Sequence, residues 1–545
     1  MTTLASIIRD ALNDVDRYKL DLTYSLKDAV EISKRAILHS GDSPIAGIRG
    51  PPGTGKTKVM EGLINNEDVI DELLSGKYKF VYVAPTNELT TSGFARALRP
   101  IIKILGESES SIDKILSKIR IYGSATPSPY FGNDLNELKK VATVSNDVLK
   151  KMANGGIDDA IFVFATSYQS VSKKMRESGY KFVLFVDEAS KMPFYLPFNP
   201  VSEAELRELR ELAQGNASGV VHSLVVVGDE RQAVAVGPEY QGYGKSLLLL
   251  PMIEDILVRE KGSRQFMTLD TTFRLPEPTQ WPIGDGFYAD TDIQLRAVED
   301  AKERLKNRLR NIEDWEERRS RCRNLVNDKG NLWNTVVGSV ENALSSLIPV
   351  ILVNTKNTVK AGENSEPTRV RLAAYYANLL KCLLGNNAGI SVIGPYIDLV
   401  EDARYYLRKI GGAKVNIRFL TVQSMLGGED DIVISMLGKE WISGTNDDEE
   451  VTIYFREPEN LNVQLSRHKL MLIVIGNLQT LRNSAAEVAQ PAKATHRGKP
   501  RGLSAEAERI HITIDTLLRL AGISANENIL KPSEGKYAMF MKVDQ

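Results

Sequence analysis

One glycine-rich string limits what this chain of 545 residues can fold into more than any other feature. The string is Gly50-Pro51-Pro52-Gly53-Thr54-Gly55-Lys56-Thr57. A short apolar stretch, residues 44–48, precedes it, and a helical pattern, residues 58–64, follows it. A strand, a glycine-rich loop and a helix start are what a phosphate-binding P-loop requires, because the glycines let successive backbone N–H groups face a triphosphate. The string therefore predicts a binding site for a nucleoside triphosphate.

Two side chains of this string have expected roles in that site. Lys56 would reach the β- and γ-phosphates, and the hydroxyl of Thr57 would be a ligand of Mg²⁺. The expected cofactors are thus ATP and Mg²⁺. The alternative is a chance match to the string, and the strand and helix on either side of it count against that.

Composition excludes several other classes of protein. The net charge is −1, so any polyanion must be held by a local basic groove. Two cysteines, Cys322 and Cys382, exclude a disulfide framework and a cysteine-based zinc site, and suit a reducing compartment. Charged residues interrupt the N-terminus, so no signal peptide is expected, and no apolar run is long enough to span a bilayer. The expectation is a soluble cytoplasmic protein.

Apolar runs that read as strands alternate with helical patterns in both halves of the chain. Such runs suit parallel strands buried on both faces, and the alternation indicates doubly wound α/β sheets. The expected strands are 44–48, 78–85, 160–165, 182–186 and 223–227 in the first half, and 349–353, 390–393, 417–422, 431–436 and 470–475 in the second.

Three stretches fall outside this plan. Residues 100–160 read as an insertion. A charged helix is expected over about 296–325, where Val298, Ala301, Leu305, Leu309, Ile312 and Trp315 form one apolar stripe. It is either a solvated arm packed by that stripe or an arm that grips nucleic acid. Residues 489–502 read as a basic flexible linker before a C-terminal segment.

Two further strand ends carry polar groups that suit hydrolysis of a triphosphate. Asp187 and Glu188 follow an apolar strand, so Asp187 would hold Mg²⁺ and Glu188 would orient and deprotonate the attacking water. Alone, such a pair could equally be a solvated loop. Gln232 lies in Gly228-Asp229-Glu230-Arg231-Gln232 and could hydrogen-bond the γ-phosphate or its water.

Hydrolysis also needs cations that meet the charge developing on the γ-phosphate. Arg274, in residues 269–276, and Arg467, in residues 461–469, lie outside the first half and are the candidates. For each of them the alternative is an ordinary surface charge.

Taken together, the motifs resemble those of superfamily 1 helicases, in the branch typified by the nonsense-mediated-decay RNA helicase. The resemblance covers about residues 20–485, with the motifs in family order. They are GPPGTGKT at 50–57, APTN at 84–87, DEAS at 187–190, GDERQ at 228–232, TFRLPEP at 272–278, FY at 287–288, VIGPY at 392–396, TVQSMLGGEDD at 421–431 and LNVQLSRHKL at 461–470.

The resemblance implies two tandem RecA-like P-loop domains with helical insertions and with ATP between the domains. The expected ranges are 1–262 for the first domain (insertion about 100–160), 263–485 for the second (charged helical insertion about 290–345), and 486–545 for the basic linker and C-terminal segment. The first domain would supply Lys56, Thr57, Asp187, Glu188 and Gln232, and the second would supply Arg274 and Arg467.

The same resemblance assigns the remaining contacts. Phe273 matches the aromatic residue near adenine, and Glu429 the acid near the ribose. Thr86, Asn87, Thr421 and Ser424 match positions that contact the nucleic-acid backbone. The expected partner is single-stranded DNA or RNA, with 5′→3′ movement by a monomer that could join a larger complex that processes nucleic acid.

Some positions depart from the family pattern. Leu26 stands where a glutamine usually reads adenine, which puts strict selection of ATP in doubt. Lys191 follows DEAS where a glutamine is common. Gln423 and Leu426 replace the Asp and Gln of the usual TVDSFQG string, which would weaken coupling between ATP and the strand.

Two other functions are consistent with parts of the sequence. An AAA+ ATPase has the same P-loop string, but here strands continue past residue 340 and Arg467 lies far downstream. An ATP-gated clamp or an RNP-remodelling ATPase would bind nucleic acid without unwinding it, and the departures at Leu26, Gln423 and Leu426 suit that function.

Overall fold

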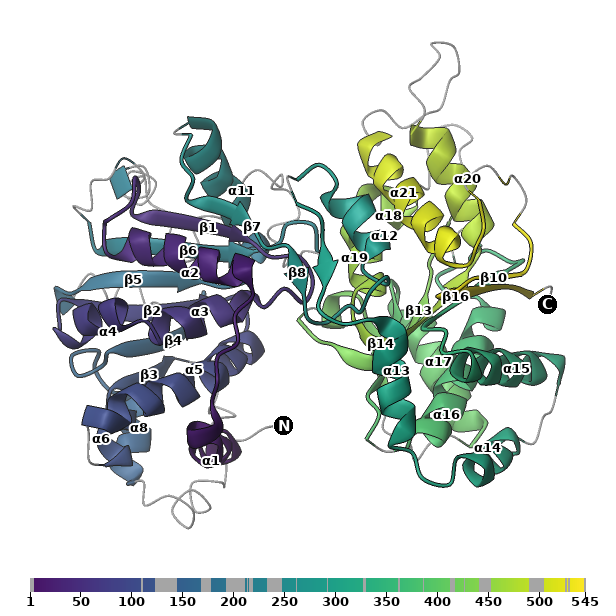
Figure 1. The fold of residues 1–545 in the computed structure, drawn as a ribbon, viewed down its shortest axis with the longest axis horizontal. Helices are drawn as coiled ribbons and strands as arrows, with labels where there is room; N and C mark the ends of the chain where they lie inside the picture. Colours follow the sequence, from purple (N-terminus) through teal and green to yellow (C-terminus); the bar gives the residue numbers. More distant parts are fainter. Residues whose placement is uncertain are drawn as a thin grey trace. The chain divides into compact units, whose positions relative to one another are not determined.

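The computed structural model describes residues 4–108, 111–122, 145–167, 178–192, 211–212, 214, 219–232, 248–260, 262–291, 293–326, 330–360, 363–385, 387–411, 417–425, 427–440, 452–489, 504–524, 527 and 530–543. Leu426 and residues 490–502 of the linker predicted at 489–502 lie outside these residues. Contacts divide the chain into two compact units (Figure 1). The first comprises Met1–Pro51, Gly55–Glu230 and Val236–Leu269, and the second comprises Pro52–Thr54, Arg231–Ala235 and Asp270–Gln545.

The first unit contains a seven-stranded sheet in the order β3-β4-β2-β5-β6-β1-β7. All of its pairings are parallel. The strands are β1 (Ile45–Arg49), β2 (Tyr78–Ala84), β3 (Ile119–Tyr122), β4 (Phe162–Thr166), β5 (Lys181–Val186), β6 (Val221–Gly228) and β7 (Phe266–Thr268). The five strands predicted in this half are confirmed. β7 was not predicted, and β3, at one edge, lies within the stretch expected to be an insertion.

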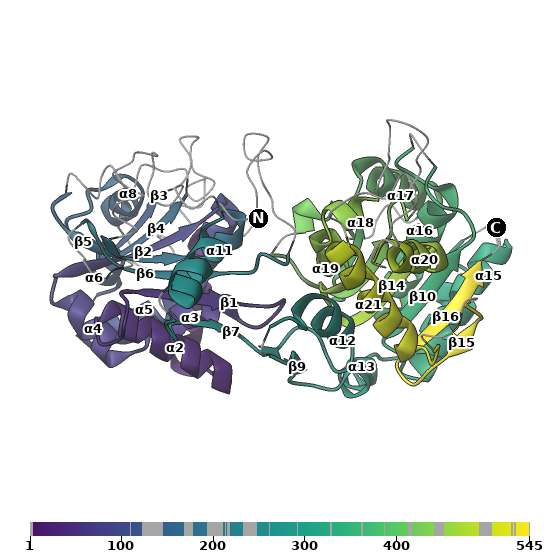
Figure 2. The ribbon, with the colours of Figure 1, turned by 90° about the horizontal axis from the view of Figure 1, so that it is seen from above.

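Helices cover both faces of this sheet (Figure 2). Because almost every strand residue is buried, the strands lack the polar alternation of a half-exposed sheet. The helices are α1 (Leu4–Asp14), η1 (Val15–Arg17), α2 (Tyr24–Ile37), α3 (Lys56–Ile64), α4 (Glu67–Leu74), α5 (Asn87–Ser108), α6 (Ile112–Ser117), α8 (Asn146–Asn154), η3 (Ala189–Lys191), α11 (Leu249–Glu254) and the π-helix η7 (Asp255–Glu260).

The second unit contains another seven-stranded sheet, in the order β12-β11-β13-β14-β10-β16-β15. Its pairings are parallel except that β15 runs antiparallel to β16. The strands are β10 (Val350–Thr355), β11 (Ile390–Gly394), β12 (Arg418–Thr421), β13 (Asp430–Met436), β14 (His468–Gly476), β15 (Ser533–Glu534) and β16 (Ala538–Val543). The five predicted strands and the α/β fold class are confirmed. β16, from the C-terminal segment, pairs with β10 and was not expected.

The second unit also contains a small two-stranded sheet and a set of helices. The pair is β8 (Thr271–Thr272) with β9 (Arg296–Ala297). The helices are α12 (Trp281–Ile283), the π-helix η8 (Gly284–Tyr288), α13 (Ala301–Arg310), α14 (Trp315–Arg323), α15 (Asn331–Ser345), α16 (Pro367–Leu384), α17 (Ile397–Lys409), η9 (Gln423–Met425), α18 (Ile453–Arg456), α19 (Glu459–Leu465), α20 (Leu478–Ala489) and α21 (Ser504–Leu520).

The charged segment 296–325 forms two helices, so the expectation of one continuous helix is wrong. α13 ends before Asn311, and Asp314 has a φ of 52°, a left-handed conformation that interrupts the helical path. The apolar stripe nevertheless packs on the core of the second unit: Leu305 is buried, and Leu309, Ile312 and Trp315 lie against the same cluster. Val298 is the exception, because it is 51% exposed.

The two cysteines form one disulfide, Cys322–Cys382, between α14 and α16. The sequence excluded a disulfide framework and suited a reducing compartment, and this single bond was not anticipated. Among the described helices, none is both long enough and apolar enough to cross a membrane.

Candidate nucleotide-binding site

The P-loop joins β1 to α3 in the predicted order of strand, loop and helix. Gly50 N–H donates to the carbonyl of Gly228 at 2.8 Å, which anchors the start of the loop to the end of β6. Gly55 precedes α3 with a φ of +86°, a left-handed conformation that favours glycine. The N-terminus of α3 carries the partial positive charge of a helix start, which suits a phosphate.

The structure brings together four of the five site residues expected in the first domain, Lys56, Thr57, Asp187 and Glu188. Lys56 Nζ donates to the carbonyl of Gly50 at 2.9 Å, so its side chain folds back over the loop. The same ammonium lies 3.9 Å from Glu188 Oε1. Thr57 Oγ1 donates to Asp187 Oδ2 at 3.3 Å. Residues far apart in sequence thus meet at the C-terminal edge of one parallel sheet, where α/β proteins bind ligands.

The oxygen donors in this cluster fit Mg²⁺. A hydroxyl and a carboxylate are the hard ligands that Mg²⁺ takes alongside the oxygens of a nucleotide. Within the described part of the chain, no group of three His, Cys, Asp or Glu side chains gathers to hold a metal. Thr57 and Asp187 are therefore the protein groups that would hold Mg²⁺ with bound ATP.

The two acids are buried side by side. Asp187 is 4% exposed and Glu188 is 8% exposed. Burial and the nearby charge of Glu188 raise the pKa of the Asp187 carboxyl. Glu188 also has a φ of 51°, and its N–H donates to Asp187 Oδ1 at 2.8 Å. A left-handed glutamate beside the site is the kind of backbone strain found at functional positions.

Lys191 pairs with the expected catalytic base. Its Nζ lies 2.8 Å from Glu188 Oε2, and Lys191 is 5% exposed. In the sequence this lysine was noted only as a departure from the family pattern. Two lysines, Lys56 and Lys191, thus face the two acids, and this pairing offsets the cost of burying the carboxylates.

Tyr82 was missed by the sequence reading. Its hydroxyl donates to Asp187 Oδ2 at 2.8 Å, and the side chain is 1% exposed. Burial and the charge of Asp187 raise the pKa of Tyr82 well above its usual value, so the hydroxyl stays protonated and donates. The available signal was a phenol within the buried run Phe80–Ala84 of β2, because a buried hydroxyl needs a hydrogen-bond partner.

The loop after β6 is held close to the acidic loop. Ser190 Oγ accepts a hydrogen bond from Asp229 N–H at 2.9 Å. A Cβ at Gly228 would lie 2.8 Å from Ser190 N, so the approach requires a glycine. Arg49 Nε, immediately before the P-loop, donates to Glu230 Oε1 at 2.8 Å.

Leu26 is fully buried in α2. An added Cβ at Gly55 would lie 3.4 Å from Leu26 Cδ1, so the leucine packs behind the P-loop glycine. An apolar side chain offers no hydrogen bond to a base, which leaves selection of adenine to other groups.

Gln232 was expected in the first domain because it follows β6 in sequence. Its contacts instead assign it to the second unit. Its Oε1 accepts a hydrogen bond from Arg467 Nη2 at 2.7 Å. Arg467 is 1% exposed, so it is not the surface charge that was the alternative reading. The structure therefore joins two of the expected site residues directly.

Arg274 and Glu429 also pair. Arg274 Nε donates to Glu429 Oε2 at 2.8 Å, and Lys469 Nζ lies 2.8 Å from Glu429 Oε1. Burial opposes ionisation of Glu429, but the charges of Arg274 and Lys469 outweigh burial and lower the pKa of its carboxyl to about 2. The expected ribose contact is thus an ionised partner of an expected catalytic arginine.

Arg304 of α13 is a second residue that the sequence did not reveal. Its guanidinium donates to the carbonyls of Arg274 at 2.6 Å, Phe273 at 3.1 Å and Lys469 at 3.0 Å. Phe273 N–H in turn donates to the carbonyl of Gly53, in the part of the P-loop that groups with the second unit, at 2.9 Å. No local pattern distinguishes Arg304 from the other cations of its charged helix.

The expected nucleic-acid residues lie at the ends of strands or starts of helices. Thr86 is exposed, its Oγ1 accepts from Leu89 N–H at 3.3 Å, and Asn87 begins α5. Thr421 ends β12, and its Oγ1 lies 3.0 Å from Ser424 Oγ, which is exposed. All four residues carry polar side chains, and in the structure the hydroxyls of Thr86, Thr421 and Ser424 make local hydrogen bonds.

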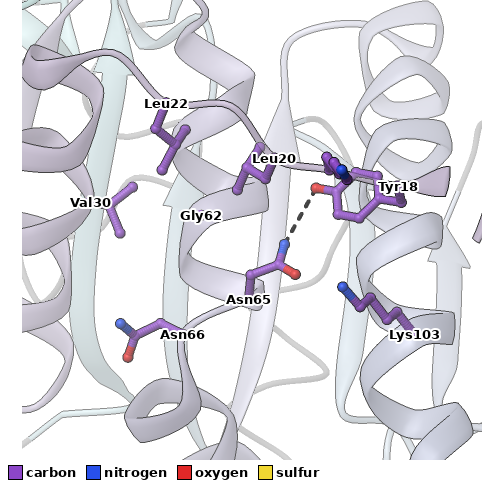
Figure 3. A pocket seen from close by; sticks show the side chains of 9 residues that line it. Tyr18, Leu20, Leu22, Val30, Gly62, Asn65, Asn66 and Lys103 are labelled. Carbon is purple, nitrogen blue, oxygen red and sulfur yellow. Dashed lines mark hydrogen bonds between the residues drawn. The ribbon is translucent and has the colours of Figure 1, made fainter. Parts of the chain in front are cut away.

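The first unit also has a separate open hollow of about 590 Å³ (Figure 3). At one side of it Asn65 Nδ2 donates to Tyr18 OH at 3.3 Å. Its lining contains none of the predicted site residues and consists of Tyr18, Lys19, Leu20, Leu22, Val30, Gly62, Asn65, Asn66 and Lys103.

Comparison with known proteins gives one family match and distant structural likenesses. A family model described as an AAA domain (AAA_12) matches residues 257–479, which is less than half of the chain and excludes the P-loop. No curated protein matches the chain.

Three solved structures illustrate the structural likenesses. The PRRSV helicase is 13% identical, with a TM-score of 0.33 and coverage of 86% of this chain and 60% of that one. The arterivirus nonstructural protein 10 helicase, solved with DNA, is 14% identical, with a TM-score of 0.32 and coverage of 83% and 64%. The DUF1998 helicase MrfA, bound to DNA and AMPPNP, is 12% identical, with a TM-score of 0.36 and coverage of 86% and 50%. The chain spans less than two thirds of the length of each of these proteins.

Proposed function

We propose that the chain is an ATP-dependent helicase or translocase that acts on single-stranded DNA or RNA through two RecA-like units. The observation that carries the proposal is the meeting of Lys56, Thr57, Asp187 and Glu188 at one edge of the first sheet. A lysine, a hydroxyl and two acids in this arrangement are the parts that hydrolysis of a triphosphate needs.

Each residue would have a separate task. Lys56 would bind the β- and γ-phosphates, while Thr57 and Asp187 would hold Mg²⁺, which neutralises phosphate charge when bound. Glu188 would accept a proton from the attacking water. Gln232 would contact the γ-phosphate or its water, and Arg274 and Arg467 would stabilise the charge that develops there.

The nucleic-acid part of the proposal is supported by the ordered series of motifs and by the polar groups at Thr86, Asn87, Thr421 and Ser424. Contacts of this kind grip phosphate and sugar without reading sequence, so they suit either DNA or RNA. Movement from 5′ to 3′ follows from the family resemblance. Phe273 and Glu429 would contact adenine and ribose.

Two variants test the nucleotide site. Lys56→Ala should lose binding of a fluorescent ATP analogue, because the phosphates lose their main cation. Glu188→Gln should bind the analogue normally but release phosphate about 10²- to 10⁴-fold more slowly, because the water loses its base. Lys58→Ala removes a lysine two positions later on the same helix, so it is the matched control and should behave like the wild type. Near-normal hydrolysis by Glu188→Gln would exclude Glu188 as the base.

An ATP-gated clamp is the second candidate function. It is favoured by the apolar, fully buried Leu26 behind the P-loop and by Gln423 in the altered 421–431 string. A strand-displacement assay on duplexes with single-stranded tails separates the two functions. A helicase would release the strand with ATP, whereas a clamp would bind the tail in an ATP-dependent way without release.

A further inference from the structure

The phenol of Tyr82 fixes the orientation of the expected metal ligand. Its hydroxyl donates to Asp187 Oδ2 at 2.8 Å, the same oxygen that accepts from Thr57 Oγ1 at 3.3 Å. The other carboxylate oxygen, Oδ1, accepts from Glu188 N–H at 2.8 Å. Asp187 is therefore held on both oxygens, and Tyr82 is the contact that comes from a different strand.

The ring of Tyr82 is confined on several sides. It stacks on Phe185 with ring centroids 5.9 Å apart, and it lies 5.7 Å from the ring of Phe164. A ring packed in this way has few alternative rotamers, so the neighbouring side chains and backbone determine where its hydroxyl lies.

Helix α5 also packs directly against the Tyr82 ring, at Gly93. A Cβ at position 93 would overlap the Tyr82 ring and would lie 2.7 Å from its hydroxyl oxygen. Glycine within a helix costs about 1 kcal/mol relative to alanine, and its use here lets the helix backbone touch the phenol. Gly93 thus makes α5 a direct neighbour of the group that holds Asp187.

The same helix begins at the residues expected to contact nucleic acid. Asn87 is its first residue, and the carbonyl of Thr86 accepts from Thr90 N–H at 3.0 Å. Gly93 lies six positions after Asn87, about 9 Å along the helix axis. A helix transmits a displacement over that distance as a rigid body, so movement at its start reaches the Tyr82 ring.

We propose that Tyr82 and Gly93 link the nucleic-acid contacts at the start of α5 to the metal ligand Asp187. Tyr82 is a positioning residue: it acts on bound Mg²⁺ only through Asp187. Binding of a single strand at Thr86 and Asn87 shifts α5, and Gly93 passes the shift to the phenol and thus to the carboxylate. This inference rests on the proposed function, since it uses both the nucleotide site and the nucleic-acid contacts.

The test measures Mg²⁺ dependence without hydrolysis. A fluorescent ATP analogue is titrated with Mg²⁺, with and without a short oligo(dT) or oligo(U), and the half-saturating Mg²⁺ concentration is recorded. Tyr82→Phe removes only the hydroxyl, and Tyr78→Phe removes a hydroxyl from the same strand, at a ring that stacks on His222 away from Asp187. Thermal unfolding of each variant verifies that it is folded.

Tyr82→Phe should raise the half-saturating Mg²⁺ concentration about tenfold, the usual effect of losing a partner of a metal ligand. It should leave binding of the analogue without Mg²⁺ unchanged. The oligonucleotide should shift the Mg²⁺ midpoint of the wild type and of Tyr78→Phe but not that of Tyr82→Phe. Gly93→Ala, which displaces the ring and keeps the hydroxyl, should reproduce the Tyr82→Phe result.

If Tyr82→Phe matches Tyr78→Phe in both titrations, the link is wrong while the proposed function stands. If the Mg²⁺ midpoint rises but the oligonucleotide still shifts it, the coupling through α5 is wrong. If the wild type shows no Mg²⁺-dependent binding of the analogue, both the link and the proposed function are overturned.

Discussion

The ammonium of Lys191 lies 2.8 Å from Oε2 of Glu188, and these side chains are only 2% and 10% exposed. The base proposed for hydrolysis is therefore held in a buried ion pair by a residue three positions later. Asp187 is buried beside this pair, and burial together with the charge of Glu188 raises the pKa of its carboxyl.

Removing the lysine should destabilise the fold. Lys191→Met leaves Glu188 buried with less compensating charge, and loss of one partner of a buried pair costs about 3–5 kcal/mol of unfolding free energy. The double variant Lys191→Met with Glu188→Gln should recover most of that loss. Urea unfolding followed by circular dichroism measures both, and strictly additive effects would show that the two side chains do not interact.

Arg467 should be needed for turnover more than for binding. Arg467→Ala removes the guanidinium that donates to Gln232 at 2.7 Å, and loss of an arginine of this kind costs about 10³-fold or more in kcat. Arg467→Lys should recover little, because one ammonium cannot replace the planar fork. Single-strand binding should persist in both variants. Wild-type kcat in Arg467→Ala would show that the residue has only a structural role.

Stability should fall as the pH is lowered below about 6.5. Burial, with the charges of Arg304 and Arg274, lowers the pKa of His468 to about 3, so the folded protein keeps this imidazole neutral and its Nε2 lies 2.9 Å from Thr279 Oγ1. Between about pH 6.5 and 3 the unfolded chain holds the proton and the folded protein does not, so unfolding becomes more favourable as the pH falls through that window.

His468→Gln tests this pH dependence because glutamine does not titrate. The drop in unfolding free energy from pH 7.5 to pH 5.5 should be smaller in the variant than in the wild type. His222, whose pKa burial lowers to about 4, contributes in the same direction and should leave part of the drop in place. An equal drop in both proteins would contradict the assignment to His468.

The disulfide should stabilise the second unit. Cys322 and Cys382 are separated by 60 positions, and closing a loop of that length stabilises a fold by about 4 kcal/mol in the chain-entropy model. Reductant should therefore lower the midpoint of unfolding, read by tryptophan fluorescence, to which Trp333 in the same core as Cys322 contributes. Cys322→Ser should show the lower midpoint and no response to reductant. A wild type that ignores reductant would indicate that the bond does not form.

The parts of the fold that could be predicted are those whose secondary structure is specified by the pattern of consecutive residues. A glycine-rich loop between strand and helix, and apolar strands such as β5 and β6, carry their structure in consecutive residues. The strand β16 could not be predicted in this way. It is short, it lies in the C-terminal segment beyond the linker predicted at 489–502, and it joins the sheet by pairing with β10.

The candidate site shows the same division. Lys56, Thr57, Asp187 and Glu188 stand in recognisable strings, and the structure brings them together. Tyr82 and Arg304 do not, because their contacts depend on which backbone and side-chain groups the fold places beside them. Residues that support a site through such contacts have no local signature, so only the packed structure reveals them.

The most direct test of the central claim is the steady-state ATPase rate with no polynucleotide, with single-stranded DNA and with single-stranded RNA at one fixed salt concentration. Salt must be fixed because binding to phosphates weakens steeply as it rises. The account predicts strong stimulation by at least one polymer, which would also identify the strand on which the protein acts. An ATPase rate that neither polymer changes would contradict it.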